Sequence, residues 1–222
     1  RLLRSGIVGF NFKSKPLDDR YWALILAGLT AVMLVRGGFG FIEAFAAVLN
    51  PTRPVAIDAG DPDPQQRSSL LGLTIEKAFA GQDLRDANSA ACCISAVWLW
   101  HDFLDQSHEI SQHIESISGS FWHAIMHRRE GDFSNAKYWF RKVPDHAVYE
   151  EMTTAAESLL AQEPQINISQ LTSEGTWDPF LFVDLCQQAV TVDPSLLPFC
   201  QELTRTEWQL LFDYCYRQAC GE

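Results

Sequence analysis

Helix-capping residues recur at almost every joint of the chain from about residue 66 to its end. Asp178-Pro179 and Asp193-Pro194 each place an N-cap acceptor before a proline that suits the first helical position. The run Thr204-Arg205-Thr206-Glu207 matches a capping box that would open a helix over 208–219. No stretch beyond residue 66 alternates between polar and apolar side chains as a half-buried strand does. We therefore predict an all-α domain over residues 66–222, a compact bundle of about seven or eight helices.

The other joints of this domain predict helices whose approximate limits follow from caps and glycines. Ser120 is expected to cap the start of the helix over 121–130, and Gly131 is expected to end that helix. The expected ranges are 70–79, 86–105, 107–114, 121–130, 134–143 and 146–162.

The composition is that of a folded globular protein, with 47% hydrophobic and 20% charged residues among 222. Residues 66–222 carry ten Lys and Arg against twenty-two Asp and Glu, a net charge of −12. Such a domain repels phosphate backbones, so we expect no nucleic-acid partner. The six cysteines include no Cys-x-x-Cys pair. We interpret them as buried apolar side chains in a reducing compartment, the cytoplasm or the inner side of an organelle.

Residues 1–50 form an apolar segment of different character. The fifteen residues between Arg20 and Arg36 are uncharged. The apolar stretch reaches membrane-spanning length over 21–42 if Arg36 extends its side chain to the interface. Two interpretations stay open: membrane association through 21–42, which would tether the protein, and a buried hairpin broken at the paired glycines. The proline-rich residues 51–65 are expected to form a linker.

Residues 120–143 read SFWHAIMHRREGDFSNAKYWFRKV. Gly131, followed by Ala136 and an aromatic run, resembles the turn and second helix of a single tetratricopeptide or Sel1-like hairpin. No second copy occurs at a period of about 34 to 40 residues, so no repeat array is predicted. Together with WLWHDFLDQSHEISQ and WDPFLFVDLC, the stretch is also similar to an uncharacterised all-helical family of bacterial and fungal proteins. That resemblance implies no known activity and does not extend to residues 1–65.

Two histidines and a carboxylate share one face of the helix expected over 121–130. At about 100° per residue, His123, His127 and Glu130 fall within about 60° of one another. Apolar side chains fill the other side of this helix, so the polar face is distinct.

The preceding helix offers a second polar set if it continues without a break through 86–114. His101, Asp105 and His108 then lie on one stripe. A short connection joins the two helices and would let them lie antiparallel. The two sets would then face each other.

Imidazole nitrogens and carboxylate oxygens are the ligands that zinc, iron and manganese accept. The facing sets therefore predict a divalent-metal site or, without a metal, an acid–base site. The third interpretation is a structural network of hydrogen-bonded polar side chains, in which this spacing of histidines and acids is more common than in metal or acid–base sites.

A locally basic stretch inside the acidic domain supplies a different candidate. Arg128, Arg129 and Lys137 have the charge to hold an anionic ligand. The alternative is a solvated helical face whose cations pair with neighbouring acids.

The chain lacks the glycine-rich phosphate loops and the nucleophile elbow of common enzyme classes. The leading hypothesis is therefore a helical interaction or accessory-subunit domain with protein partners. The alternative is an enzyme or metal-binding protein using the His/Asp/Glu site between the helices over 86–114 and 121–130. An anion-binding module is the weaker alternative.

Overall fold

The fold is all-α, as the capping pattern predicts. The computed structural model describes residue 53, residues 55–161 and residues 166–221. These residues contain two 3-10 helices, η1 (Ile168–Gln170) and η2 (Pro194–Leu196), and a minute antiparallel hairpin of β1 (Thr172–Ser173) and β2 (Thr176–Trp177). The nine α-helices of the described residues are α3 (Arg67–Leu71), α4 (Ile75–Ala78), α5 (Ala87–Trp100), α6 (Leu104–Ser111), α7 (Ile117–Arg129), α8 (Phe133–Phe140), α9 (Val148–Leu160), α10 (Pro179–Thr191) and α11 (Leu197–Cys220).

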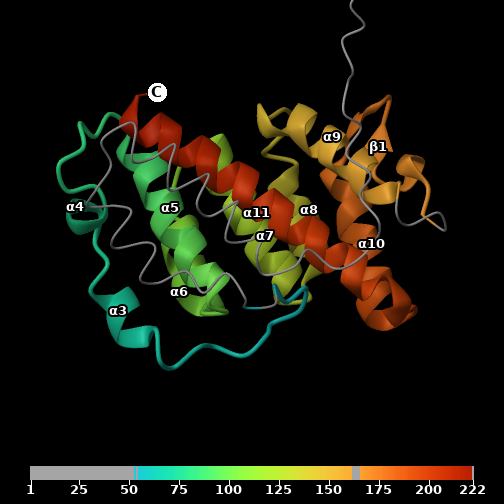
Figure 1. Cartoon of the computed structure of the whole chain (residues 1–222), viewed down its shortest axis with the longest axis horizontal. Helices are drawn as coiled ribbons and strands as arrows, with labels where there is room; N and C mark the ends of the chain where they lie inside the picture. Colours follow the sequence, from blue (N-terminus) through green and yellow to red (C-terminus); the bar gives the residue numbers. More distant parts are fainter. Residues whose placement is uncertain (1–52, 54, 162–165, 222) are drawn as a thin grey trace, which may run out of the picture.

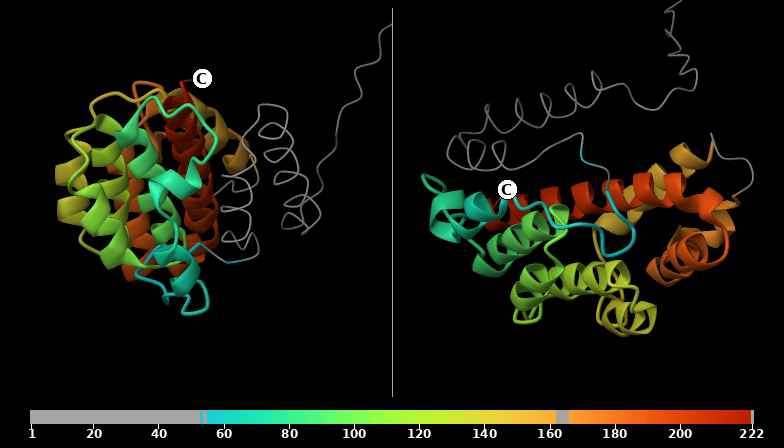
Figure 2. Two further views of the ribbon diagram at one scale, coloured as in Figure 1. Left: turned by 90° about the vertical axis from the view of Figure 1, so that its left-hand side faces the viewer. Right: turned by 90° about the horizontal axis from the view of Figure 1, so that it is seen from below.

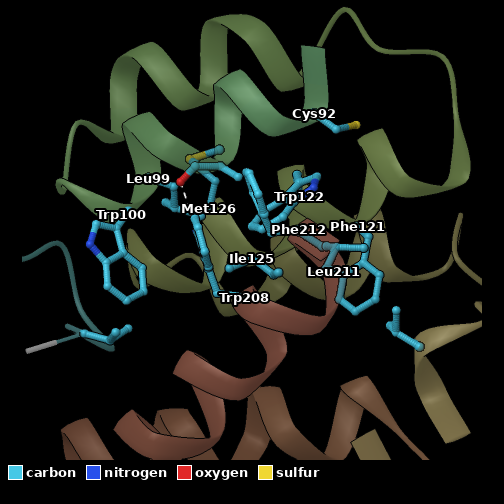
Figure 3. Packing of buried hydrophobic residues seen from close by; sticks show 14 of the residues in the cluster. Cys92, Leu99, Trp100, Phe121, Trp122, Ile125, Met126, Trp208, Leu211 and Phe212 are labelled. Carbon is cyan, nitrogen blue, oxygen red and sulfur yellow. Dashed lines mark hydrogen bonds between the residues drawn. The ribbon is translucent and has the colours of Figure 1, made fainter. Parts of the chain in front are cut away.

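The longest helix, α11, crosses most of the helical body and contacts α5, α9 and α10 (Figures 1 and 2). Trp208 on α11 stacks on Phe212 with ring centroids 4.9 Å apart, and its ring lies 4.7 Å from that of Trp100 on α5. Its indole nitrogen donates a hydrogen bond to the carbonyl oxygen of Ala96 at 2.9 Å (Figure 3). The ring centroid of Trp122 on α7 lies 6.0 Å from that of Trp208. Large aromatic side chains therefore join α5, α7 and α11 in one core.

Two of the predicted N-caps, Asp178 and Asp193, are confirmed by hydrogen bonds. The Asp178 carboxylate accepts from the backbone N–H of Phe180 at 2.8 Å, and α10 starts at the following proline. Asp193-Pro194 opens η2, which leads directly into α11. The capping box at Thr204–Glu207 is wrong, because these residues lie inside α11. Thr204 and Glu207 are buried and continue the buried stripe of that helix, so the helix has no reason to restart there.

The helix predicted over 86–105 ends early. The start is close to the prediction: Asp86 is the N-cap of α5 and accepts from the backbone N–H of Asn88 at 3.0 Å. The helix stops at Trp100, and Asp102 adopts a positive φ of 62° before α6 begins at Leu104. The chain therefore turns at residues 101–103, and the assumption of one continuous helix through 86–114 is wrong.

Other helix limits also differ from the prediction, and α6 begins at Leu104 instead of residue 107. The helix expected over 70–79 is two short helices, α3 and α4, separated at Gly72–Thr74. α7 begins at Ile117 instead of Phe121, because Ser116 and not Ser120 accepts a backbone hydrogen bond, from Gly119 at 3.0 Å. The turn between α7 and α8 is built on Gly131, whose φ is +79°, as expected for a helix-ending glycine.

The expected linker packs on the helical body over its described residues. Val55 and Ile57 are buried in the core. Arg53 forms an ion pair with Asp102, and the Arg129 side chain donates to the carbonyl oxygen of Asp58 at 2.7 Å. This segment is therefore part of the folded domain and is not a free spacer.

The predicted apolar segment 1–50, including 21–42, lies outside the described residues. Among the helices that the structure does describe, none combines the length and the apolar character that crossing a membrane requires. All six cysteines are described; five are buried and Cys220 is partly exposed.

Candidate metal centre

The turn at residues 101–103 sets α6 against α7, and this contact creates the site. His108 lies on α6, and His123 and His127 lie one helical turn apart on α7. His123 and His127 are buried and His108 is half-buried. The three imidazoles thus approach one another from two helices, near the surface of the domain.

Ring nitrogens of the three histidines converge on one point. Each residue offers one nitrogen, and these nitrogens all lie within 4.8 Å of one another. The Nε2 atoms of His123 and His127 are 3.0 Å apart. The His108 ring centroid lies 4.7 Å from that of His123 and 5.2 Å from that of His127. A tetrahedral ion with metal–nitrogen distances of about 2.0–2.1 Å separates two ligand nitrogens by about 3.3 Å, which is close to the separation of the His123 and His127 nitrogens.

The opposite ring nitrogen of His127 is held by a carboxylate. Its Nδ1 lies 2.9 Å from Oε2 of Glu130. A carboxylate only accepts, so this bond places the imidazole proton on Nδ1 and leaves the Nε2 lone pair facing the cluster. Carboxylates behind metal-bound histidines have this role.

His123 has a comparable acceptor behind it. Its Nδ1 lies 2.9 Å from the hydroxyl of Ser111, which is itself 3.4 Å from the carbonyl oxygen of His108. When Ser111 donates to that carbonyl, it accepts from Nδ1 of His123, and the Nε2 lone pair of His123 also faces the cluster. With the proton of His123 on Nδ1, the two Nε2 lone pairs lie 3.0 Å apart and repel each other, and a cation between them removes that repulsion. With the proton of His123 on Nε2, that nitrogen donates to Nε2 of His127 instead.

The buried imidazoles are neutral at pH 7, which is the state that binds a metal. Burial, with the neighbouring His127, His108 and Lys142, lowers the pKa of His123 to about 3. Burial also lowers the pKa of His127, although the hydrogen bond that His127 donates to Glu130 acts in the opposite direction. No proton has to be removed from these two rings before an ion binds.

The second helix of the hairpin, α8, covers one side of the cluster. Trp139 packs on His123 with ring centroids 4.1 Å apart, and the Lys142 amine lies 3.6 Å from the Trp139 ring centroid. The side-chain amide nitrogen of Asn135 lies 3.1 Å from Nε2 of His127. These three side chains and Ser111 surround the histidine cluster. They come from other parts of the chain, so the spacing of residues on a single helix does not predict them.

The structure brings together four of the six residues predicted for this site. His108, His123 and His127 converge, and Glu130 holds His127 from behind instead of joining the group as a ligand. His101 is not part of the cluster: it is the buried C-cap of α5, with Nδ1 3.8 Å from Asp63. Asp105 is exposed and lines a separate cavity of about 300 Å³ beside Gly60. The break at Asp102 explains both corrections, because it removes the shared helical stripe.

The predicted anion-binding residues do not form a site. Arg128 pairs with Glu207 inside the core, Arg129 pairs with Asp102, and Lys137 pairs with Asp184 near the surface. Each of these cations already forms an ion pair with a carboxylate of the same chain. The two arginines are also buried. The alternative interpretation, cations paired with neighbouring acids, is the one observed, although the two arginines are buried instead of solvated.

Comparison with known protein families, with curated proteins and with solved structures finds no match for this chain. The similarity to an all-helical family of bacterial and fungal proteins therefore stays a prediction, as does the likeness of α7 and α8 to a tetratricopeptide hairpin. Function has to be argued from the site itself.

Proposed function

We propose that this domain binds one divalent transition-metal ion, with zinc as the first choice, through His108, His123 and His127. The observation that carries the proposal is the convergence of three imidazole nitrogens from two helices within 4.8 Å. Two of these rings have an acceptor behind them that turns Nε2 toward the group.

The ligand set favours some metals over others. Three neutral imidazoles suit zinc, copper, iron and nickel, whereas manganese prefers oxygen ligands. Among the described residues, no carboxylate joins the convergent group. A single-ion site is therefore better supported than the paired-metal, carboxylate-rich site of helical bundles.

Metal titration of the full chain tests this proposal. We expect one Zn²⁺ per chain, and an increase in melting temperature on addition of zinc, because only the folded state assembles the ligands. Co²⁺ should give visible absorption without the intense near-ultraviolet band of thiolate ligation, which separates the histidine site from the cysteines.

Variants locate the ion. His108→Ala alters a half-buried side chain and should leave folding intact while weakening zinc binding at least tenfold. His123→Ala and His127→Ala should abolish the stabilisation by zinc. His113→Ala is the matched control, because His113 is an exposed imidazole close to the same helix. Equal zinc binding by wild type and all three cluster variants would overturn the proposal.

The hypothesis of an interaction or accessory-subunit domain stays a prediction. It is compatible with a bound metal, since a metal-binding domain can also have protein partners. Exposed apolar side chains such as Leu71, Tyr138 and Val192 belong to different helices or helix ends. Scattered exposed residues of this kind are normal on a soluble domain, and they do not add support.

A further inference from the structure

The proposed metal site has three protein ligands, and this number has a chemical consequence. Zinc is almost always four-coordinate in proteins: structural sites fill all four positions with side chains, whereas reactive sites keep one position for water or substrate. Within the described residues, the convergent group holds the three imidazoles and no further Asp, Glu, Cys or His. One position on the ion would be left for a ligand from outside.

The free position has to lie on the solvent side of the cluster. His123 is 1% exposed and His127 is 6% exposed, so the inner side of the site is closed by protein. His108 and Trp139 are only half-buried, and Lys142 is exposed. An exchangeable ligand can therefore reach the ion from the side where α6 and α8 flank the histidines.

The side chains on that flank suit an anionic oxygen ligand. The Lys142 amine lies against Trp139, which in turn packs on His123. The Asn135 amide, 3.1 Å from Nε2 of His127, is within reach of an atom bound to the ion. A positive charge and a neutral donor thus stand beside the free position.

We propose that the metal centre is open, and that its fourth position holds water in exchange with small anions such as a carboxylate group. The incoming anion displaces the water molecule, its oxygen accepts a hydrogen bond from Asn135, and Lys142 stabilises its negative charge. This inference rests on the proposed metal site, and it adds the class of ligand that the site recognises.

The Co²⁺ form of the full chain tests the open position directly. Azide and acetate are added separately, and the visible spectrum of the bound cobalt is followed. We expect each anion to shift the absorption bands in a saturable way, because replacing an oxygen ligand changes the ligand field. A spectrum that shows bound Co²⁺ but does not respond to either anion overturns the open position and leaves the metal site standing. Failure to bind Co²⁺ at all overturns both proposals.

Two variants test the roles of the flanking side chains. Lys142→Met should weaken anion binding about 3- to 10-fold and leave metal affinity within about twofold, as expected for a charge near but not on the ion. Lys137→Met removes the same charge from α8 at a residue paired with Asp184, and it should bind anions like wild type. Equal anion affinity in wild type and Lys142→Met contradicts the role of the cation.

Asn135→Ala separates an open site from a closed one. The backbone N–H of Asn135 donates to the Asp132 carboxylate that caps α8, and Asn135→Ala keeps this N–H, so the helix should persist. We expect weaker anion binding with little change in Co²⁺ affinity. The alternative is that the Asn135 carbonyl oxygen is itself the fourth ligand. Asn135→Ala would then lose at least tenfold in metal affinity and become responsive to azide, which would overturn the proposal.

Discussion

The guanidinium of Arg128 and the carboxylate of Glu207 form an ion pair in the core, between residues 79 positions apart. Their side chains are 1% and 0% exposed. Nη1 of Arg128 lies 3.3 Å from Oε1 of Glu207, and Nη2 binds the second carboxylate oxygen, so the contact is bidentate. The same guanidinium lies over the ring of Phe182, 4.5 Å from its centroid. This pair joins α7, which carries two of the site histidines, to α11.

Removing one partner of this pair should destabilise the fold strongly. Glu207→Gln leaves the Arg128 charge buried without its counter-ion, and we expect a loss of about 3–5 kcal/mol in the free energy of unfolding. Replacing both residues, as in Arg128→Met with Glu207→Leu, should cost much less, because no charge remains buried. Urea denaturation gives the free energy of unfolding of the wild type, of Glu207→Gln and of the double variant. Lys137→Met breaks a surface pair as a control and should cost less than about 1 kcal/mol. A double variant that loses as much unfolding free energy as Glu207→Gln, or more, would contradict this account.

Glu130 should support metal binding without touching the ion. Glu130→Ala removes the acceptor behind His127, and we expect zinc affinity to fall about 10- to 100-fold. Glu130→Gln retains an oxygen acceptor and should lose less. Glu109→Ala, at an exposed acid on α6 that contacts Gln112, serves as the control for charge. Competition with a chromophoric chelator gives these affinities. A loss of several thousandfold would instead make Glu130 a direct ligand, as the sequence suggested.

Gly60 should be intolerant of any side chain. Its φ is +65°, and a Cβ added there would lie 2.6 Å from Cγ of Asp102. Asp102 cannot move aside easily, because Arg53 and Arg129 both hold its carboxylate. Gly81 has a φ of +82° with nothing within 4 Å of an added Cβ. We expect Gly81→Ala to cost about 1 kcal/mol from backbone strain alone. Gly60→Ala should lower the melting temperature clearly further, and equal melting temperatures would contradict the close contact.

The stability of the protein should fall in mild acid through His146. Burial lowers the pKa of His146 to about 4. Its Nδ1 accepts from the backbone N–H of Val148 at 3.3 Å, and its Nε2 lies 3.1 Å from the hydroxyl of Ser118, so both contacts fit the neutral ring. The unfolded chain takes up the proton near the ordinary histidine pKa of 6.5, before the folded protein does. Stability is therefore present above about pH 6.5 and is lost as the pH falls toward 4.

Denaturant titrations at pH 7 and pH 5 measure this effect. His146 should contribute about 2 kcal/mol of the loss in unfolding free energy between these two values. His146→Gln should reduce the pH dependence by about that amount, whereas His113→Gln, an exposed substitution, should follow the wild type. Identical pH dependence in wild type and His146→Gln would be evidence against the role of this residue. Zinc is kept out of these samples, because it would add its own pH dependence.

Much of the fold follows from local chemistry. An aspartate before a proline opens α10 because the acceptor and the fixed φ act within three residues. Gly131 follows the end of α7 because it can adopt the positive φ that the turn into α8 requires. The face predicted to be shared by His127 and Glu130 needs only three residues of helix, and Nδ1 of His127 lies 2.9 Å from Oε2 of Glu130. Each of these relationships depends on neighbours along the chain.

Other features depend on contacts between distant segments. Thr204–Glu207 has the pattern of a cap, yet it lies within α11, where Glu207 meets Arg128 of another helix. Asp102 breaks the helix over 86–114, and its strained backbone is held by Arg53 and Arg129. Neither arginine is a neighbour in sequence, so no local pattern announces the break.

The amino-acid sequence by itself determined the helical character of the domain, most of its joints, and the face that His123, His127 and Glu130 share. Only the tertiary structure decided that His108 joins this face while His101 and Asp105 do not, and that Ser111 and Asn135 complete its surroundings. The physical reason is the range of the forces involved. Capping and helical periodicity act over a few residues, whereas the approach of α6 to α7 results from a backbone turn held by side chains far away along the chain.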